Sequence, residues 1–229
     1  MIFPIPILNA YFKRNPFGKG IVSVWGDFGV GKTTFALQTL YNTNKKGSES
    51  IYIFTKPTFP YERINRIMQE SKEDLDHISF VRLENFNDLH NLVFNLEFLI
   101  LKKSNTKENL YKLIVIDSLT DLYRLELNRE KKDMNYNLNY RLNQILANLF
   151  YLSEHYDIDI LVINEKVQIR ENDQNIEIQS GGKVMEYWVT LDIKIERTEV
   201  LKEREIILTN HSNGDHINFR SNLTENGFQ

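Results

Sequence analysis

The chain has 229 residues, of which 41 % are apolar and 26 % are charged, which suits one globular domain with a sizeable core. Its 28 Lys and Arg stand against 31 Asp and Glu, and the net charge of −3 excludes a whole-protein attraction to nucleic acid or to acidic membranes. The lack of cysteine excludes disulfides and thiolate metal sites and fits a reducing compartment.

The first residues, MIFPIPILNAYF, are apolar but have no basic leader, and Pro4 and Pro6 interrupt them. They therefore do not fit a signal peptide. No uncharged run along the chain approaches the length that a membrane span needs. We expect a cytoplasmic protein without a membrane partner.

Short β-rich apolar runs predict strands at residues 21–25, 51–54, 78–83, 113–116, 158–163, 189–195 and 206–209. Apolar residues at helical spacing predict helices over residues 89–100 and 138–156. Buried strands that alternate with amphipathic helices predict an α/β fold, with a mainly parallel sheet flanked by helices. After residue 180 strands follow one another closely, which predicts a C-terminal antiparallel extension. The polar stretches 128–143 and 168–182 are expected to be loops.

The first predicted strand runs into GDFGVGKTT, two glycines four residues apart followed by Lys and Thr. Such a loop turns successive backbone N–H groups toward one phosphate, and the following helix adds its positive N-terminal end. We expect a nucleotide to contact Gly26, Asp27, Phe28, Gly29, Val30, Gly31, Lys32, Thr33 and Thr34. Lys32 would reach the β- and γ-phosphates of ATP, and Thr33 would bind Mg²⁺. The alternative, a glycine-rich turn with an exposed lysine, is disfavoured by the strand before the loop and the helix after it.

A carboxylate at the end of a second buried strand would complete such a site. Asp117 ends the run LIVID and is the candidate second ligand for Mg²⁺, opposite Thr33. An Asp in this position is also typical of a cap for the next helix. The phosphate loop favours the metal role.

Three segments carry a resemblance to a known family: VIDSLTDLYRLE at 115–126, ILVINE at 160–165 and GGKVMEYWVTLDIKIER at 181–197. They resemble the core ATPase domain of the RecA/RadA recombinases and look most like the archaeal RadB paralogues. Residues 209–228 are similar to the closing strand pair of that domain, so the resemblance covers nearly the whole chain. It implies one RecA-like P-loop ATPase core over residues 1–229 without the helical N-terminal DNA-binding domain. It also implies ATP binding with Mg²⁺ and a role in homologous recombination and DNA repair.

The chain departs from the family pattern where hydrolysis is catalysed. The family follows its second strand with Asp-Thr-Glu, whose Glu activates water, whereas this chain has Phe54, Thr55 and Lys56. A protonated lysine has no lone pair with which to accept a proton, and losing a positioned base costs about 10²–10⁴-fold in rate. The family also ends a later strand with Asn-Gln, where this chain has Asn164 and Glu165.

Two readings of Lys56 and Glu165 remain open. They form an ion pair over the γ-phosphate, or they are solvated side chains that point apart; in the absence of the pair, Glu165 is the leading substitute base.

A third departure replaces the family's Lys-His-Arg with residues 210–212, Asn-His-Ser, which removes two cations. The resemblance also suggests that Arg63 stacks on adenine, with a helix-surface role as the alternative. We therefore expect ATP to bind and to be hydrolysed weakly.

DNA binding, if any, should centre on one basic stretch. Between residues 124 and 141 five Lys and Arg stand against three Asp and Glu, a net +2, with Tyr136 and Tyr140 interleaved. The candidate DNA contacts are Arg129, Lys131, Lys132 and Tyr136. Charge with base stacking suits single-stranded or branched DNA, and a solvated loop leading into a helix is the alternative. Residues 167–180 carry a net −2 and would repel phosphate, so binding should be weak and salt-sensitive.

The sequence thus predicts an ATP-binding regulator of recombination, acting through a recombinase partner or a homodimer. One alternative is an active DNA-stimulated ATPase that carries out strand exchange. Another is a non-catalytic subunit or a KaiC-like signalling ATPase that never meets DNA.

Overall fold

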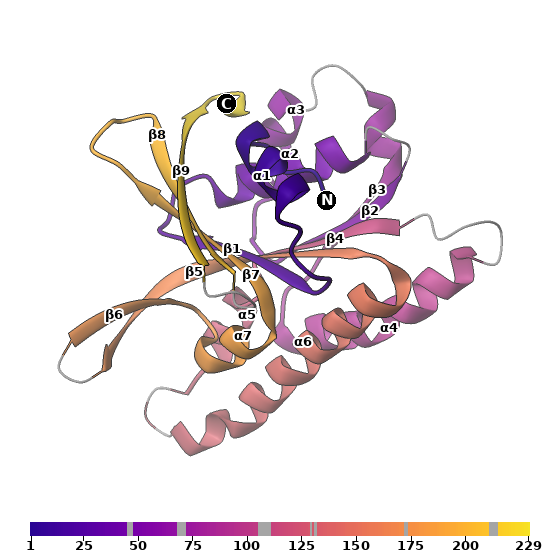
Figure 1. Cartoon of the computed structure of the whole chain (residues 1–229). Coiled ribbons are helices and arrows are strands. Elements are labelled where there is room, and N and C mark those ends of the chain that lie inside the picture. Colours follow the sequence, from indigo (N-terminus) through magenta and orange to yellow (C-terminus); the bar gives the residue numbers. More distant parts are fainter. Residues whose placement is uncertain are drawn as a thin grey trace.

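A computed structural model describes residues 1–44, 48–67, 72–104, 111–128, 130, 132–171, 174–210 and 215–229. In these residues one large twisted sheet forms the middle layer, and helices cover both of its faces (Figure 1). The strands are β1 (Ile21–Gly26), β2 (Glu49–Phe54), β3 (Ile78–Arg82), β4 (Tyr111–Asp117), β5 (Asp159–Glu171), β6 (Gln174–Gln179), β7 (Val189–Arg197), β8 (Glu203–Asn210), β9 (Asp215–Thr224) and β10 (Gly227–Phe228). Their order across the sheet is β10-β9-β8-β7-β1-β5-β4-β2-β3, and β6 pairs only with β5.

Strand β1 lies in the middle of the sheet. Every one of its residues is buried, as expected for a strand that is covered on both faces. It pairs in parallel with β5 on one side and β7 on the other. In this register Gly26 faces Glu165, while Asp117 at the end of β4 faces Phe54 at the end of β2. Parallel pairing therefore gathers the ends of β1, β2 and β4 beside Glu165 of β5, along one edge of the sheet.

The helices divide between the two faces of the sheet. They are α1 (Pro6–Arg14), α2 (Lys32–Asn44), α3 (Tyr61–Ile67), η1 (Lys72–His77), α4 (Phe86–Ser104), α5 (Asp121–Glu126), η2 (Lys132–Asn135), α6 (Tyr136–Tyr156) and α7 (Gly182–Trp188). Leu8 of α1 and Phe35 of α2 share a core with Val22 and Val24 of β1. On the other face α4 and α6 lie side by side and pack on Ile21 (Figure 1). Alternate residues of one strand thus enter two separate cores.

The α/β class, the mainly parallel sheet and the antiparallel C-terminal extension are confirmed. Strands β7, β8 and β9 pair antiparallel in sequence, and β10 folds back on β9. Strand β7 alternates between buried and partly exposed residues, as expected for a sheet with one solvated face.

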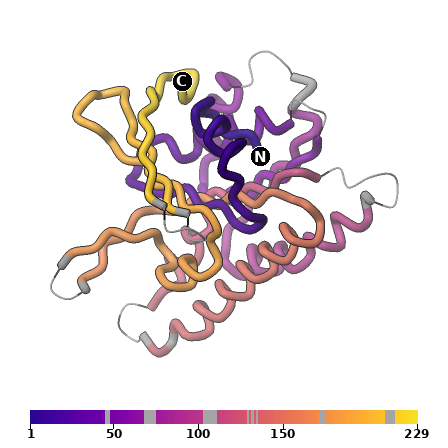
Figure 2. The backbone as a smooth tube through the Cα atoms, viewed as in Figure 1, coloured from indigo at the N-terminus to yellow at the C-terminus, as the bar shows by residue number. Residues whose placement is uncertain are grey.

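The prediction of a loop over residues 168–182 is wrong. Strand β5 continues outward and pairs with β6 in a hairpin that projects from the body (Figure 2). Val167 lies opposite Ile178 and Ile169 lies opposite Ile176, so two apolar cross-strand pairs hold it together. Charged neighbours hide this period-two pattern in the sequence.

The predicted loop over residues 128–143 is too long, because α6 begins at Tyr136. The apolar start of the chain folds as α1, with Pro6 in its first turn, where a missing N–H costs nothing. Phe3, Ile5 and Leu8 are buried there. Among the described residues, none of the helices combines the length and apolar character that crossing a membrane demands.

Candidate nucleotide site

A cleft of about 850 Å³ opens at the edge of the sheet where β1, β2 and β4 end, beside Glu165 of β5. This volume lies within the range of about 300–1,000 Å³ that small-molecule pockets occupy. Its walls come from the loop after β1, from α3 and from the turn after β9, and its floor includes Tyr52, Asp117 and Glu165. Of the residues predicted to contact nucleotide, Phe28, Gly29, Gly31, Lys32, Thr33, Thr34 and Arg63 line it.

The loop between β1 and α2 needs its glycines. Gly29 and Gly31 have φ of 77° and 108°, backbone conformations that other residues rarely adopt. A Cβ on Gly31 would lie 2.8 Å from a methyl carbon of Leu223, and one on Gly26 would lie 2.2 Å from the carbonyl oxygen of Ile195. Helix α2 begins at Lys32, so its unpaired N–H groups face the cleft. Val30 is buried beneath the loop.

Lys32 is buried and held by three acceptors. Its Nζ donates to the carbonyl oxygens of Gly26 at 2.9 Å and Asp27 at 2.7 Å. It also contacts Glu165 Oε2 at 2.8 Å, and the Glu165 side chain is 19 % exposed. A phosphate group that approaches Lys32 therefore meets a carboxylate already bound to it.

Asp117 is buried at the end of β4 and receives a hydrogen bond from inside the protein. The Tyr52 hydroxyl donates to its Oδ2 at 2.8 Å. Burial, and next the charge of Asp117, raises the pKa of Tyr52 well above its usual value, so the phenol keeps its proton. Asp117 Oδ1 accepts no hydrogen bond from the described residues.

Lys56 reaches the point where the predicted metal ligands converge. Its Nζ donates to Thr33 Oγ1 at 3.2 Å and lies 3.3 Å from Asp117 Oδ1. Hydroxyl and carboxylate oxygens are donors that suit Mg²⁺. With an ammonium already beside both oxygens, however, a divalent cation does not fit this arrangement of the site.

The hypothesis of an ion pair between Lys56 and Glu165 does not hold in this structure. Among the described residues of the cleft, Lys56 pairs with Asp117 and Glu165 pairs with Lys32. The charges are matched in these two separate pairs. Glu165 is consequently already engaged by a cation.

Arg63 lies on α3, where it is exposed and also lines the cleft beside Tyr61 and Phe59. Both the adenine-stacking role and the helix-surface role remain compatible with this position.

The phosphate loop is also tied to the β5–β6 hairpin, which the sequence reasoning missed. Lys166 Nζ lies 2.9 Å from Asp27 Oδ2 and 2.7 Å from Glu177 Oε1. The hydrogen bond from Lys166 to Glu177 is the main cause, and that from Lys194 the next, of a pKa of Glu177 lowered to about 2. The sequence signal for this link is the alternation of charged residues along β5, β6 and β7.

A buried polar network lies behind the cleft and was likewise missed. Gln179 Oε1 accepts from Ser23 Oγ at 2.6 Å and from Asn164 Nδ2 at 3.1 Å. Its Nε2 donates to Asp192 Oδ2 at 3.2 Å, and Thr120 Oγ1 donates to Asn164 Oδ1 at 3.1 Å. Ser23 and Asn164 interrupt apolar strands, which is the sequence signal for such a network.

The candidate DNA contacts are only partly described. Tyr136 at the start of α6 is 74 % exposed and Tyr140, one turn later, is 55 % exposed. Lys132 belongs to η2, whereas Arg129 and Lys131, like residues 211 and 212, lie outside the described residues. The described part of the chain holds no group of three His, Cys, Asp or Glu suited to a metal ion.

Comparison with known proteins places this site in a family. The Rad51 family model matches residues 17–208. The chain is 30 % identical over 225 residues to the DNA repair and recombination protein RadB of Methanococcus maripaludis strain C5, covering 97 % of each chain. It is 29 % identical over 217 residues to the protein of the same name from Methanocaldococcus jannaschii, covering 92 % of this chain and 93 % of that one.

Proposed function

The chain belongs to the Rad51 family, and from that premise we propose that it acts in DNA repair and recombination as an ATP-binding regulator that hydrolyses ATP slowly. RadB is the name printed for relatives that match this chain over nearly its full length. The regulatory character is our inference from the cleft.

The observation that carries the proposal is the place of Lys56. Hydrolysis requires an acceptor for the proton of the attacking water. A lysine ammonium next to Thr33 and Asp117 offers no lone pair for that proton. Glu165, the substitute base, would have to give up its contact with Lys32 before it could serve. Binding and turnover are therefore separated by the chemistry of the side chains.

ATP would bind with its phosphates against the N–H groups of the loop and near the ammonium of Lys32. The exposed face of α3, with Tyr61 and Arg63, is the wall available to the adenine ring. The site can hold a triphosphate because its glycines keep the backbone free of side chains at the point of contact.

We propose that DNA binding is weak and confined to the start of α6. Tyr136 is exposed there and can stack on a base, and the basic residues 129, 131 and 132 precede it in sequence. The partner would be a recombinase or a second copy of this chain in the cytoplasm.

One observation favours a second function, a DNA-stimulated ATPase. Lys166 joins the phosphate loop to the projecting hairpin, so a ligand on the hairpin has a physical connection to the nucleotide. Fast phosphate release that DNA stimulates would establish this function. A KaiC-like role without DNA would instead be indicated by recovery without a recombinase and by no DNA shift.

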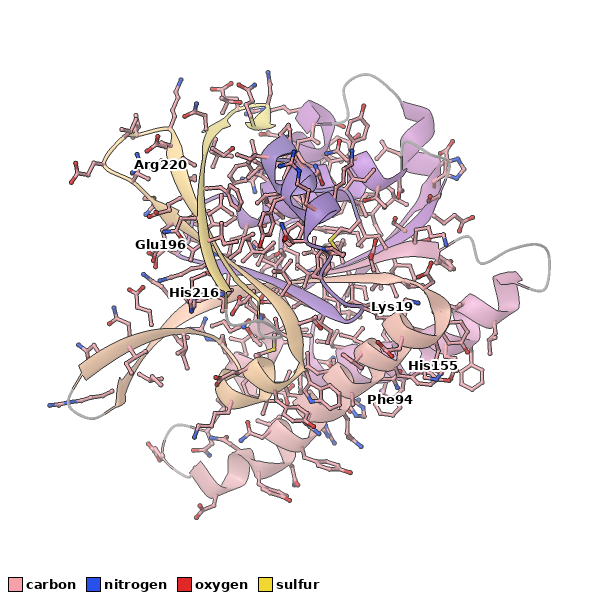
Figure 3. The ribbon with its side chains drawn as sticks, viewed as in Figure 1. Lys19, Phe94, His155, Glu196, His216 and Arg220 are labelled. Atoms are coloured by element: carbon pink, nitrogen blue, oxygen red, sulfur yellow. The ribbon has the colours of Figure 1, made fainter. Side chains whose placement is uncertain are left out.

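ATP affinity measured beside steady-state turnover, with and without single-stranded DNA, tests the proposal. We expect saturable ATP binding with little turnover, and a gain in turnover of at least about tenfold for Lys56→Glu with Mg²⁺ present. Lys19→Glu makes the same charge change at the opposite end of β1 and should leave turnover unchanged; Lys19 is labelled in Figure 3. No gain at position 56 contradicts the assigned role of Lys56.

A further inference from the structure

We propose that the ammonium of Lys56 takes the place of Mg²⁺ in the cleft, so that the protein binds free nucleoside triphosphate instead of its metal complex. The inference rests on the proposed nucleotide site and specifies the form of ligand that this site accepts.

The two oxygens that Lys56 contacts come from different elements and converge on one point. Thr33 Oγ1 belongs to the first turn of α2, and Asp117 Oδ1 to the end of β4. The Lys56 Nζ lies 3.2 Å from the first and 3.3 Å from the second. A single cation thus already bridges the phosphate-loop hydroxyl and the strand-end carboxylate.

The backbone holds Lys56 next to this point. The N–H of the preceding Thr55 donates to the carbonyl oxygen of Asp117 at 3.0 Å, and Thr55 Oγ1 accepts from the Ser118 N–H at 3.0 Å. Because these bonds fix the strand end, the stem of Lys56 starts within reach of Asp117 and needs no rearrangement of the chain to meet it.

Among the described residues, Lys56 is the cation that forms an ion pair with Asp117. Its side chain is 2 % exposed, and among the described residues Tyr52 donates to Oδ2 while Oδ1 accepts no hydrogen bond. If Lys56 swung into solvent, the buried carboxylate would lose the cation that balances it. The side chain of Lys56 is only 38 % exposed, so much of its stem is packed as well.

A Mg²⁺ ion would therefore have to displace a lysine from a buried carboxylate and also shed its own water, which it does reluctantly. An ammonium provides point charge and three donors, and it can reach a phosphate oxygen while it keeps Thr33 and Asp117. Lys32 and Lys56 would then both contact the phosphates, with Glu165 giving up its contact with Lys32.

The test compares the affinity for a fluorescent ATP derivative in excess Mg²⁺ and in excess EDTA, by titration of fluorescence anisotropy. For the unmodified protein we expect the apparent dissociation constant to be at least about tenfold higher in excess Mg²⁺ than in EDTA, because Mg²⁺ withdraws the free nucleotide that the site accepts. For Lys56→Met we expect binding in EDTA to weaken by at least about tenfold, with most of that loss recovered in Mg²⁺. Lys19→Met, which removes an ammonium remote from the cleft, should behave as the unmodified protein does.

Binding by the unmodified protein that is as tight in excess Mg²⁺ as in EDTA, or tighter, overturns the inference while leaving ATP binding intact. An absence of binding in both conditions overturns the proposed nucleotide site itself. The comparison on the unmodified protein decides the question even if Lys56→Met does not fold. Electron paramagnetic resonance of added Mn²⁺ supplies a second readout: with ATP bound, Mn²⁺ should be immobilised by Lys56→Met and not by the unmodified protein.

Discussion

Replacing Tyr52 with Phe should destabilise the fold through a single lost hydrogen bond. The hydroxyl donates to Asp117 Oδ2 at 2.8 Å, and both residues are at most 1 % exposed. The ring stays in place, and Phe keeps its packing with Phe54 and Phe80. A hydrogen bond to a charged group contributes about 1.5–3 kcal/mol, and the carboxylate has little else to accept from.

We therefore expect Tyr52→Phe to lower the free energy of unfolding by about 2 kcal/mol. Urea unfolding followed by circular dichroism at neutral pH measures it, provided that the denaturant slope is the same for both proteins. Tyr11→Phe is the matched control, because the Tyr11 ring packs on Phe12 and Phe219 and its hydroxyl has no hydrogen bond to a described residue. A change below about 0.5 kcal/mol for Tyr52→Phe, equal to the control, would refute the account of Asp117.

Three further predictions concern the loop and the hairpin. Gly31→Ala should destabilise the protein by about 1–3 kcal/mol and weaken ATP binding, because φ is 108° at this residue. Thermal unfolding measures the change in stability. Gly18→Ala is the control and should be nearly neutral, because nothing lies within 4 Å of its added carbon. The pKa of Glu177 is lowered from 4.5 to about 2, so its contribution to stability is complete above pH 4.5 and is lost as the pH falls to about 2. In acid titrations the stability advantage of the unmodified protein over Glu177→Gln should shrink across that interval, and a constant difference would contradict the assignment. Lys166→Met should speed amide hydrogen exchange in the hairpin by at least about tenfold, and unchanged exchange would show that the bridge does not hold it.

Much of the sheet could be predicted from the sequence because the relevant patterns are local. The apolar run before Gly26 can only be buried on both faces, and the glycine spacing of the loop fixes a backbone that few other structures use. The end of β4 at Asp117 followed from the same alternation of strands and helices.

The pairing of charges in the cleft could not be read in the same way. Two lysines and two carboxylates, Lys32, Lys56, Asp117 and Glu165, can combine as two different sets of ion pairs, and the sequence leaves open whether Lys56 and Glu165 meet. Which set forms depends on distances of a few ångströms between side chains from four separate elements: the start of α2, the segment after β2, the end of β4 and the middle of β5. Sequence separation carries no information on that scale.

The hairpin was missed for a different reason. Its apolar pairs are only two, and the charged residues between them give the stretch the composition of a loop. Strand pairing there depends on β5 extending beyond the sheet, which is a property of the whole fold.

Strand β5 is one continuous strand that starts in the core and ends in the solvent-exposed hairpin. It carries Glu165 at the cleft and reaches Glu171 near the hairpin tip, about 20 Å farther at a strand's usual rise. Suppose that a bound anion pushes Glu165 aside and tilts β5, so that the strand shifts by about 1 Å over the two residues after Glu165. Because the tip is about three times farther along the strand, it would move by about 3 Å. The hairpin would thus amplify a small displacement of β5 at the phosphate site. A fluorophore near residue 175 would report the binding of an anion in the cleft.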